Sequence, residues 1–183
     1  MTALVAPVDA PPRSWTATLL DGLEAAGVTH LPYLPDKPLA TVVTDAEQRD
    51  GLVTIPLTRE EEGVGIAVGL NLAGRRSALM MQASGMGNSL NAIGSVAMAQ
   101  RIPLLLVVTE RGGLGETVST QVPFGAALPR VLDAMAVRCV PLTDAEDVEE
   151  TTRLAAELAF TSRQVVVLHV TAGMIKGRRG GVA

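Results

Sequence analysis

The sequence predicts a doubly wound α/β domain, in which a mostly parallel sheet is flanked by helices. Three continuous apolar runs, SALMMQ, IPLLLVV and QVVVLHV, are typical of strands that are buried on both faces of a parallel sheet. Helix-like segments alternate with these strands, and this alternation predicts right-handed crossover connections. The chain shows no internal repeat, linker or change in composition, so we expect one domain.

The elements are expected from capping residues, apolar periodicity and breaker residues. Ser14 can cap the first helix, and Gly27 and Gly74 follow helices as stop signals. Helices are expected at about residues 14–26, from about 39, at 60–73, 88–101, 124–137 and 145–161, and strands at 30–35, 52–57, 77–82, 102–108, 138–142 and 164–170.

Composition limits the classes of protein that fit. The 183 residues are 48% hydrophobic and 19% charged, which is a globular balance, and the net charge of -4 argues against nucleic-acid binding. The single cysteine, Cys139, excludes a disulfide framework within the chain and indicates a cytoplasmic location. No apolar run approaches the roughly 20 residues of a membrane span, so no membrane partner is expected.

The two ends of the chain differ in composition from its middle. Residues 1–13 are expected to be a flexible N-terminal arm, residues 14–175 the folded domain, and residues 176–183 a mobile basic tail.

Four loops are expected at the carboxyl ends of the strands, where ligands bind in open parallel sheets. They are Asp36-Lys37-Pro38, Thr58-Arg59-Glu60, the segment ASGMGN at 83–88, and Glu110-Arg111-Gly112-Gly113. His30 and His169 lie outside these loops, so we expect them to be structural histidines with satisfied hydrogen bonds.

The segment TREEEGVGIAVGLNLAG begins with a cluster of glutamates. Thr58 and Glu61 have the spacing of a capping box, and the cluster also complements a helix dipole. Neither explanation accounts for the apolar helix after Glu60, which leaves no polar face and should be buried nearly all round. Its glycines each cost about 1 kcal/mol relative to alanine. Close approach of another chain at a subunit interface would justify that cost.

The segment MQASGMGNSLNAIG contains a Gly-x-Gly turn that opens a helix. Such a turn can bind phosphate with exposed N–H groups. It lacks the lysine of a Walker motif and the third glycine of a dinucleotide fingerprint. Asn88 as a simple helix cap is the alternative interpretation.

Together these segments resemble the pyrimidine-binding (Pyr) domain of thiamine diphosphate enzymes. The resemblance is strongest to the family of decarboxylases that act on sulfopyruvate or phosphonopyruvate. It rests on TREEEGVGI, MQASGMGNSLNAIGS, IPLLLVVTERG, Gly115-Glu116 and QVPFGAALPRVLDAM, in this order, and extends from about Ser14 to Thr171.

The resemblance implies a thiamine diphosphate-binding fold and assigns the catalytic carboxyl group to Glu60. This group would hydrogen-bond N1′ of the cofactor's aminopyrimidine and favour the imino tautomer that acts as a base. Gly85, Met86, Gly87 and Asn88 would form the neighbouring cofactor-binding turn.

The resemblance also implies a second chain. The family's diphosphate-binding motif begins with Gly-Asp-Gly, which this sequence lacks. A separate β subunit with the diphosphate-binding (PP) domain would then carry the diphosphate and the Mg²⁺, with no metal ligand from this chain. Self-association within a hetero-oligomer is also expected, and this chain alone should be inactive.

The implied reaction is decarboxylation of 3-sulfopyruvate or 3-phosphonopyruvate to the aldehyde and CO₂. Lys37, Arg59 and Arg111 are candidate contacts for the anionic substrate, and Gln82 is a candidate hydrogen-bonding group. Each can equally be a surface charge or a polar group at a strand end. The Pro-Asp before Lys37 matches phosphonopyruvate relatives rather than sulfopyruvate relatives. Another 2-oxoacid, a carboligation, or a non-catalytic assembly subunit are the alternatives.

Overall fold

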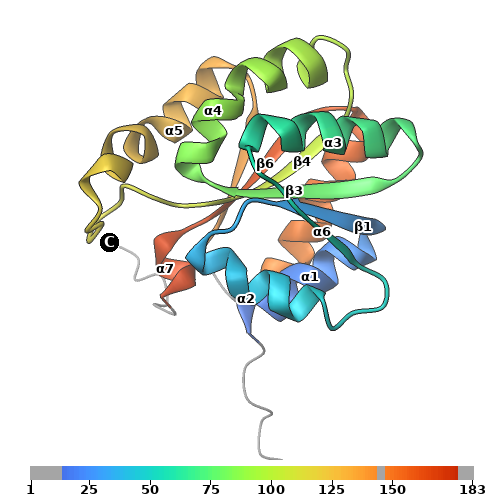
Figure 1. The fold of residues 1–183 in the computed structure, drawn as a ribbon, viewed down its shortest axis with the longest axis horizontal. Helices are drawn as coiled ribbons and strands as arrows, with labels where there is room; N and C mark the ends of the chain where they lie inside the picture. Colours follow the sequence, from blue (N-terminus) through green and yellow to red (C-terminus); the bar gives the residue numbers. More distant parts are fainter. Residues whose placement is uncertain (1–13, 144–146, 177–183) are drawn as a thin grey trace, which may run out of the picture.

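Six parallel strands form the centre of the structure (Figure 1). The computed structural model describes residues 14–143 and 147–176. The strands are β1 (Val28–Tyr33), β2 (Val53–Pro56), β3 (Arg76–Gln82), β4 (Leu104–Thr109), β5 (Arg138–Leu142) and β6 (Val165–Val170), in the spatial order β2-β1-β3-β4-β6-β5. Every neighbouring pair is parallel, so the predicted fold class is confirmed and the sheet is entirely parallel.

Helices cover both faces of this sheet (Figure 1). On one face lie α1 (Trp15–Ala25), α2 (Lys37–Ala46) and α6 (Val148–Ser162). On the other lie α3 (Glu60–Leu72), α4 (Ala83–Ala92), the π-helix η1 (Ile93–Met98) and α5 (Val122–Ala134). A 3₁₀ turn, η2 (Ser119–Gln121), precedes α5, and the short α7 (Ala172–Ile175) follows β6.

Two hydrophobic cores lie between the sheet and its helices. Because side chains alternate along a strand, Ala78 and Met80 of β3 pack into the core beneath α1, α2 and α6, whereas Leu79 and Met81 pack into the other. All six residues of β4 and of β6 are buried. This explains why their sequences are continuous apolar runs rather than alternating ones.

The order of the strands creates a switch point between β1 and β3. The chain leaves β1 through α2 on one face of the sheet and leaves β3 through α4 on the other. Ligands of such sheets bind in the crevice outside the carboxyl ends of the strands at this point. The segments after β1, β2, β3 and β4 therefore lie near one edge, as the sequence predicts.

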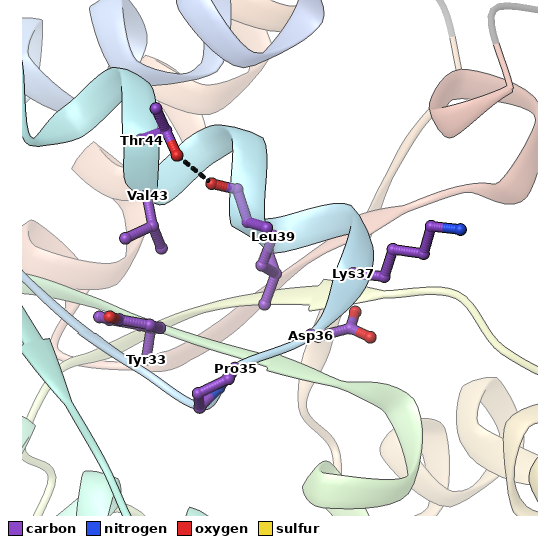
Figure 2. Close-up of a pocket in the computed structure, with 8 residues that line it drawn as sticks. Tyr33, Pro35, Asp36, Lys37, Leu39, Val43 and Thr44 are labelled. Carbon is purple, nitrogen blue, oxygen red and sulfur yellow. Dashed lines mark hydrogen bonds between the residues drawn. The ribbon is translucent and has the colours of Figure 1, made fainter.

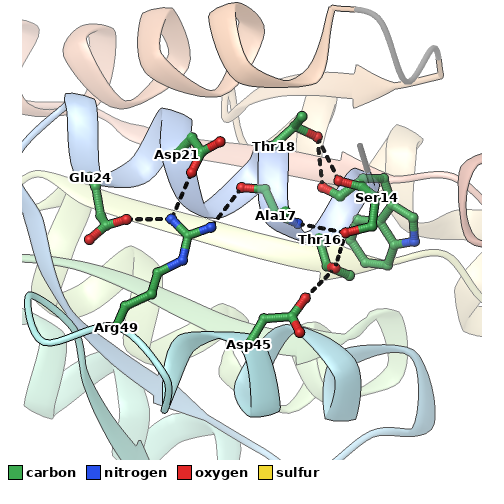
Figure 3. Close-up of polar contacts among 9 residues, drawn as sticks. Ser14, Thr16, Ala17, Thr18, Asp21, Glu24, Asp45 and Arg49 are labelled. Carbon is green, nitrogen blue, oxygen red and sulfur yellow. Dashed lines mark hydrogen bonds and ion pairs between the residues drawn. The ribbon is translucent and has the colours of Figure 1, made fainter. Parts of the chain in front are cut away.

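Polar contacts fasten the end of α2 to α1 (Figure 3). Arg49 donates to Asp21 at 2.8 Å, to Glu24, and to the carbonyl oxygen of Ala17 at 3.1 Å. Ser14 caps α1 as predicted, with its hydroxyl accepting a hydrogen bond from the N–H of Ala17. These contacts fix the helix layer under β1 and, with it, the segment that leads to Asp36.

Two helices begin earlier than the sequence suggested. Helix α2 begins at Lys37, with Pro38 in its first turn, where a missing N–H costs nothing. Helix α4 begins directly after β3, so the predicted loop at residues 83–88 is helical. Its glycines are needed for close packing against neighbouring side chains rather than for a loop conformation.

Helix α3 is less buried than its composition suggested. Gly65 and Gly69 are exposed, and a Cβ added at either glycine would meet nothing within 4 Å. Leu72, at the end of the helix, is 72% exposed. The prediction that α3 is buried nearly all round is therefore wrong for the single chain, which leaves a glycine-rich apolar face of this helix uncovered.

In the described part of the chain, no helix is long and apolar enough to cross a membrane. The predicted N-terminal arm at residues 1–13 lies outside the described residues, as does the predicted tail apart from Lys176. The division of the chain into arm, domain and tail stays a prediction.

Candidate active site

Glu60 lies where α3 meets α4. It is the first residue of α3, and its side chain is half-buried against the first turn of α4. A Cβ added at Gly85 would lie 2.6 Å from Glu60 Cγ and 2.7 Å from Glu60 Oε1, so only glycine at position 85 leaves room for this carboxyl group. The side-chain amide of Asn88 donates a long hydrogen bond of 3.4 Å to Glu60 Oε2. The structure thus brings Glu60, Gly85 and Asn88 together, as the sequence predicts.

The glutamates beside Glu60 have structural partners. Glu62 accepts hydrogen bonds from the backbone N–H and the hydroxyl of Thr58, at 3.1 and 2.9 Å, and these bonds lower the pKa of Glu62. Glu61 pairs with Arg59 at 2.9 Å. The predicted capping partner of Thr58 was Glu61, which is wrong by one residue because α3 begins at Glu60 and Glu62 reaches back over the first turn. Glu60 is the glutamate left for another purpose.

The turn at residues 85–88 is closely packed. Met86 is fully buried in the core, so it supports this turn from inside the fold. A Cβ at Gly87 would lie 3.0–3.2 Å from the ring of Phe124. The hydroxyl of Ser89 bonds back to the carbonyl oxygen of Gly85 at 3.1 Å. This first turn of α4 is therefore a packed platform, and its glycines admit Glu60 on one side and Phe124 on another.

Arg111 and Gln82 meet beside this platform. Gln82 ends β3, and its Oε1 accepts a hydrogen bond from Arg111 Nη1 at 3.0 Å. Because arginine only donates, the bonded atom must be the amide oxygen, and the amide NH₂ of Gln82 is directed elsewhere. Arg111 also donates to both carboxylate oxygens of Glu116, at 2.8 and 3.1 Å. The guanidinium is therefore occupied on three nitrogens.

Arg111 and Glu116 shift each other's pKa values through their hydrogen bonds. Hydrogen bonding to Arg111, together with the backbone N–H groups of Val118 and Gly112, lowers the pKa of Glu116 to about 2. Hydrogen bonding to Glu116 raises the pKa of Arg111. Their side chains are only 20% and 12% exposed. Glu116 thus neutralises Arg111 and holds it against Gln82.

The backbone around Arg111 is fixed by two glycines. Gly112 has a φ of +75°, and a Cβ there would lie 2.8 Å from the carbonyl oxygen of Val122. A Cβ at Gly125 would overlap the carbonyl oxygen of Arg111. Helix α5 therefore packs directly on the loop after β4, which holds this loop beside Gln82.

The other two candidate substrate residues are separated. Lys37 begins α2 and extends away from the apolar side chains of a groove of about 480 Å³ that includes Tyr33, Leu39 and Val43 (Figure 2). Lys37 also lines a cleft together with Arg111. Arg59 does not line this cleft, is 75% exposed and is paired with Glu61, which is the geometry of a surface charge.

Two buried polar groups at this edge were not predicted. Gln121, in the 3₁₀ turn before α5, has a buried Oε1 without a hydrogen-bond partner among the described residues, and so has Nε2 of His169 on β6. Burial lowers the pKa of His169, and the charge of Glu110 opposes this shift in part. The expectation of a satisfied hydrogen bond is correct for His30, whose Nδ1 lies 2.8 Å from the hydroxyl of Thr29, and wrong for His169. No sequence pattern marks either orphaned atom.

Within residues 14–143 and 147–176, there is no group of three or more His, Cys, Asp or Glu side chains that could hold a metal ion. The acidic residues of the site are instead committed to hydrogen bonds or ion pairs. Asp36, for example, accepts a hydrogen bond from the hydroxyl of Thr109 at 2.8 Å.

Residues 13–117 match the family described as "Thiamine pyrophosphate enzyme, N-terminal TPP binding domain". The chain is 34% identical to sulfopyruvate decarboxylase subunit alpha of Methanococcus maripaludis, over 78% of this chain and 86% of the relative. It is 35% identical to the protein of the same name from Methanothermobacter thermautotrophicus, over 80% of this chain and 90% of the relative. A phosphonopyruvate decarboxylase of Streptomyces viridochromogenes is 31% identical over 55% of this chain and 25% of that protein.

The fold also matches a solved structure. A 2-oxoglutarate:ferredoxin oxidoreductase from Magnetococcus marinus superposes with a TM-score of 0.74 at 18% identity, over 92% of this chain and 30% of that one. At this level of identity, the match supports the fold alone.

The Arg111–Glu116 pair should make stability depend on pH in acid. The folded-state pKa of Glu116, about 2, is below its ordinary value of 4.5. Its stabilising contribution is therefore complete above pH 4.5 and is lost as the pH falls towards 2. The difference in the free energy of unfolding between the natural chain and Glu116→Gln should shrink over this range. Urea unfolding at a series of pH values measures it, with Asp50→Asn, which removes an exposed carboxylate, as control. A difference that stays constant with pH would contradict the coupling.

Proposed function

The chain belongs to the thiamine pyrophosphate enzymes that share the N-terminal TPP binding domain, and from this we propose that it is the α subunit of a two-chain 2-oxoacid decarboxylase. The observation that carries the proposal is the Glu60 carboxyl group, which is seated on Gly85 at the carboxyl edge of the sheet. Relatives that this chain nearly spans are named as alpha subunits of sulfopyruvate decarboxylase. The proposed reaction is decarboxylation of 3-sulfopyruvate or 3-phosphonopyruvate to the aldehyde and CO₂.

The residues around Glu60 fit the pyrimidine ring of thiamine diphosphate. A pyrimidine ring bound at the C-terminal ends of the strands needs a side-chain carboxyl group to hydrogen-bond N1′. It also needs a flat surface beside it. Glu60 supplies the carboxyl group, and the absence of a side chain at Gly85 keeps it against α4. Asn88 contacts the other carboxyl oxygen, which leaves Oε1 for the cofactor. We assign Glu60, Gly85, Met86, Gly87 and Asn88 to the cofactor site, in which the buried Met86 supports the turn from the core.

Glu60 is proposed to hold a proton between its carboxyl group and N1′ of the pyrimidine. When bound, thiamine diphosphate supplies the carbon nucleophile that adds to the keto group and accepts the electrons released with CO₂. The carboxyl group makes the pyrimidine's amino group a base through the shared hydrogen bond. The Glu60 carboxyl group is present and packs closely against Gly85. This specific placement favours a catalytic subunit over an assembly subunit.

Gln82 is proposed to face the substrate next to this centre, with Arg111 as the residue that positions it. Arg111 fixes the amide of Gln82 through its oxygen, so the amide NH₂ is available as a donor to the carboxylate or keto oxygen of a 2-oxoacid. Arg111 is itself balanced by Glu116. The proposed role of Arg111 is to position Gln82. Lys37 is proposed to bind anionic groups of the substrate.

A partner chain is proposed to complete the site. The sequence contains no Gly-Asp-Gly segment, so the diphosphate and its Mg²⁺ are assigned to a β subunit with a PP domain. The uncovered face of α3, with Gly65 and Gly69 exposed four residues apart, is a surface where another backbone can approach closely. Self-association of the resulting pair is part of the same proposal. The single cysteine, Cys139, favours the cytoplasm as the proposed location.

We expect Glu60→Gln, assayed with the partner chain, to keep cofactor binding and to lose turnover by at least about 100-fold, because an amide cannot share the proton with N1′. Steady-state decarboxylation and cofactor titration measure the two quantities. Glu61→Gln is the matched control, since Glu61 is paired with Arg59. Turnover within a few-fold of the natural complex would overturn the assignment of Glu60.

Gly85→Ala should reduce turnover while the chain remains folded. The new methyl group would lie 2.6 Å from Glu60 Cγ and 2.7 Å from Oε1, so the carboxyl group must move away from α4. The matched control is Gly94→Ala, where a Cβ meets only Met135 Cε at 3.9 Å. A crystal structure of the variant would show the displacement directly. Full activity with an unmoved carboxyl group would contradict the proposed placement of Glu60 against Gly85.

Substitutions at the glycines of α3 test whether this face of the helix binds the partner chain. Gly69→Ala should stabilise the isolated chain by about 0.5–1 kcal/mol, because alanine favours a helix and the added Cβ meets no atom. The same change should weaken binding of the partner chain. Gly22→Ala, where a Cβ would overlap the backbone of α6, should instead destabilise the isolated chain by about 1–3 kcal/mol. Undiminished affinity of Gly69→Ala for the partner would exclude this face from the interface.

A further inference from the structure

The chain contains only two lysines among its 15 basic residues, Lys37 and Lys176. They are far apart in the sequence, on α2 and directly after α7. Both nevertheless line the same cleft of about 260 Å³ at the carboxyl edge of the sheet. All remaining basic residues are arginines, and among those in the described residues Arg111 alone borders this cleft.

The floor of the cleft is the loop after β4. Gly113, Leu114 and Gly115 line it, and a Cβ added at Gly115 would lie 3.5 Å from Nζ of Lys176. Lys176 is exposed to solvent, and this distance places its ammonium group beside the loop. Gly115 has a φ of +83°, so a side chain there would be strained in any case. The loop backbone thus leaves an open space next to the ammonium group.

The other charges that line the cleft are already engaged. Arg111 and Glu116 neutralise each other. Glu110 accepts a hydrogen bond from the backbone N–H of Ala172, which fixes the start of α7. Neither lysine ammonium has a hydrogen bond or an ion pair with another residue in the described part of the chain. The two positive charges of Lys37 and Lys176 exceed the one negative charge of Glu110, so the cleft has a surplus of positive charge.

We propose that this cleft is the subsite for the strongly anionic tail of the substrate, with Lys37 and Lys176 as its two cations. The inference rests on the proposed function and deepens it, because Arg111 joins the cleft to Gln82 and, through the start of α4, to Glu60. A sulfonate or phosphonate group has three oxygens, so it can accept hydrogen bonds from two ammonium groups. Pyruvate, which lacks this group, gains nothing from the cleft.

The cleft lies within one chain, so its ligand can be tested without the partner or the cofactor. Reductive methylation with ¹³C-formaldehyde keeps the charge of each lysine and labels Lys37, Lys176 and the chain terminus. The labelled full-length chain is then titrated with sulfoacetate, with phosphonoacetate and with acetate, and followed by NMR. Lys37→Gln and Lys176→Gln assign the two lysine signals. Arg75→Gln, at the opposite edge of the sheet, is the control for net charge.

We expect sulfoacetate or phosphonoacetate to shift both lysine signals together, with one dissociation constant, and acetate to bind at least tenfold more weakly. Each lysine variant should lose about tenfold in affinity for the tail anion, and Arg75→Gln should lose none. The stronger of the two anions identifies the tail as sulfonate or phosphonate. Unmoved signals, equal binding of acetate, or an equal loss in Arg75→Gln would overturn the subsite. None of these results depends on Glu60, whose failure would appear only in turnover.

Discussion

The contact between the Glu60 carboxyl group and Gly85 is the constraint on which the rest of the site depends. Helix α3 arrives from β2 and α4 leaves β3, and the Glu60 side chain can lie this close to α4 because position 85 has no side chain. The carboxyl group is thereby held at the switch point of a parallel sheet, where strand ends form a crevice. A glutamate in the same sequence without this glycine would project elsewhere.

A second fixed unit lies on the other side of Gln82. Glu116 neutralises Arg111, and Arg111 orients the amide of Gln82, so a charged residue that looks available in the sequence is committed in the fold. The consequence is a division of labour along one edge of the sheet. In the proposed function, Glu60 serves the cofactor, Gln82 faces the reacting part of the substrate, and the lysines of the cleft bind the anionic tail. The exposed glycine face of α3 leaves room for the proposed partner chain.

Much of the fold could be predicted from the sequence because burial determines its pattern. The strands β3, β4 and β6 contain continuous apolar runs because helices cover both faces of the sheet, and Ser14, Gly27 and Gly74 mark helix ends by local chemistry. The start of α4 was missed because Gly-x-Gly suggests a loop, whereas here both glycines serve contacts with residues distant in sequence. The pairing of Arg111 with Glu116, the orphaned atoms of Gln121 and His169, and the meeting of Lys37 with Lys176 depend on tertiary structure, which no local pattern records.

The central claim concerns one hydrogen bond, and a structure of this chain with its partner and thiamine diphosphate tests it most directly. The distance to measure joins a carboxyl oxygen of Glu60 to N1′ of the pyrimidine ring. We predict about 2.6–3.0 Å, with the carboxyl group still resting on Gly85. A Glu60 side chain turned into solvent, with the ring bound by other residues, would contradict the account.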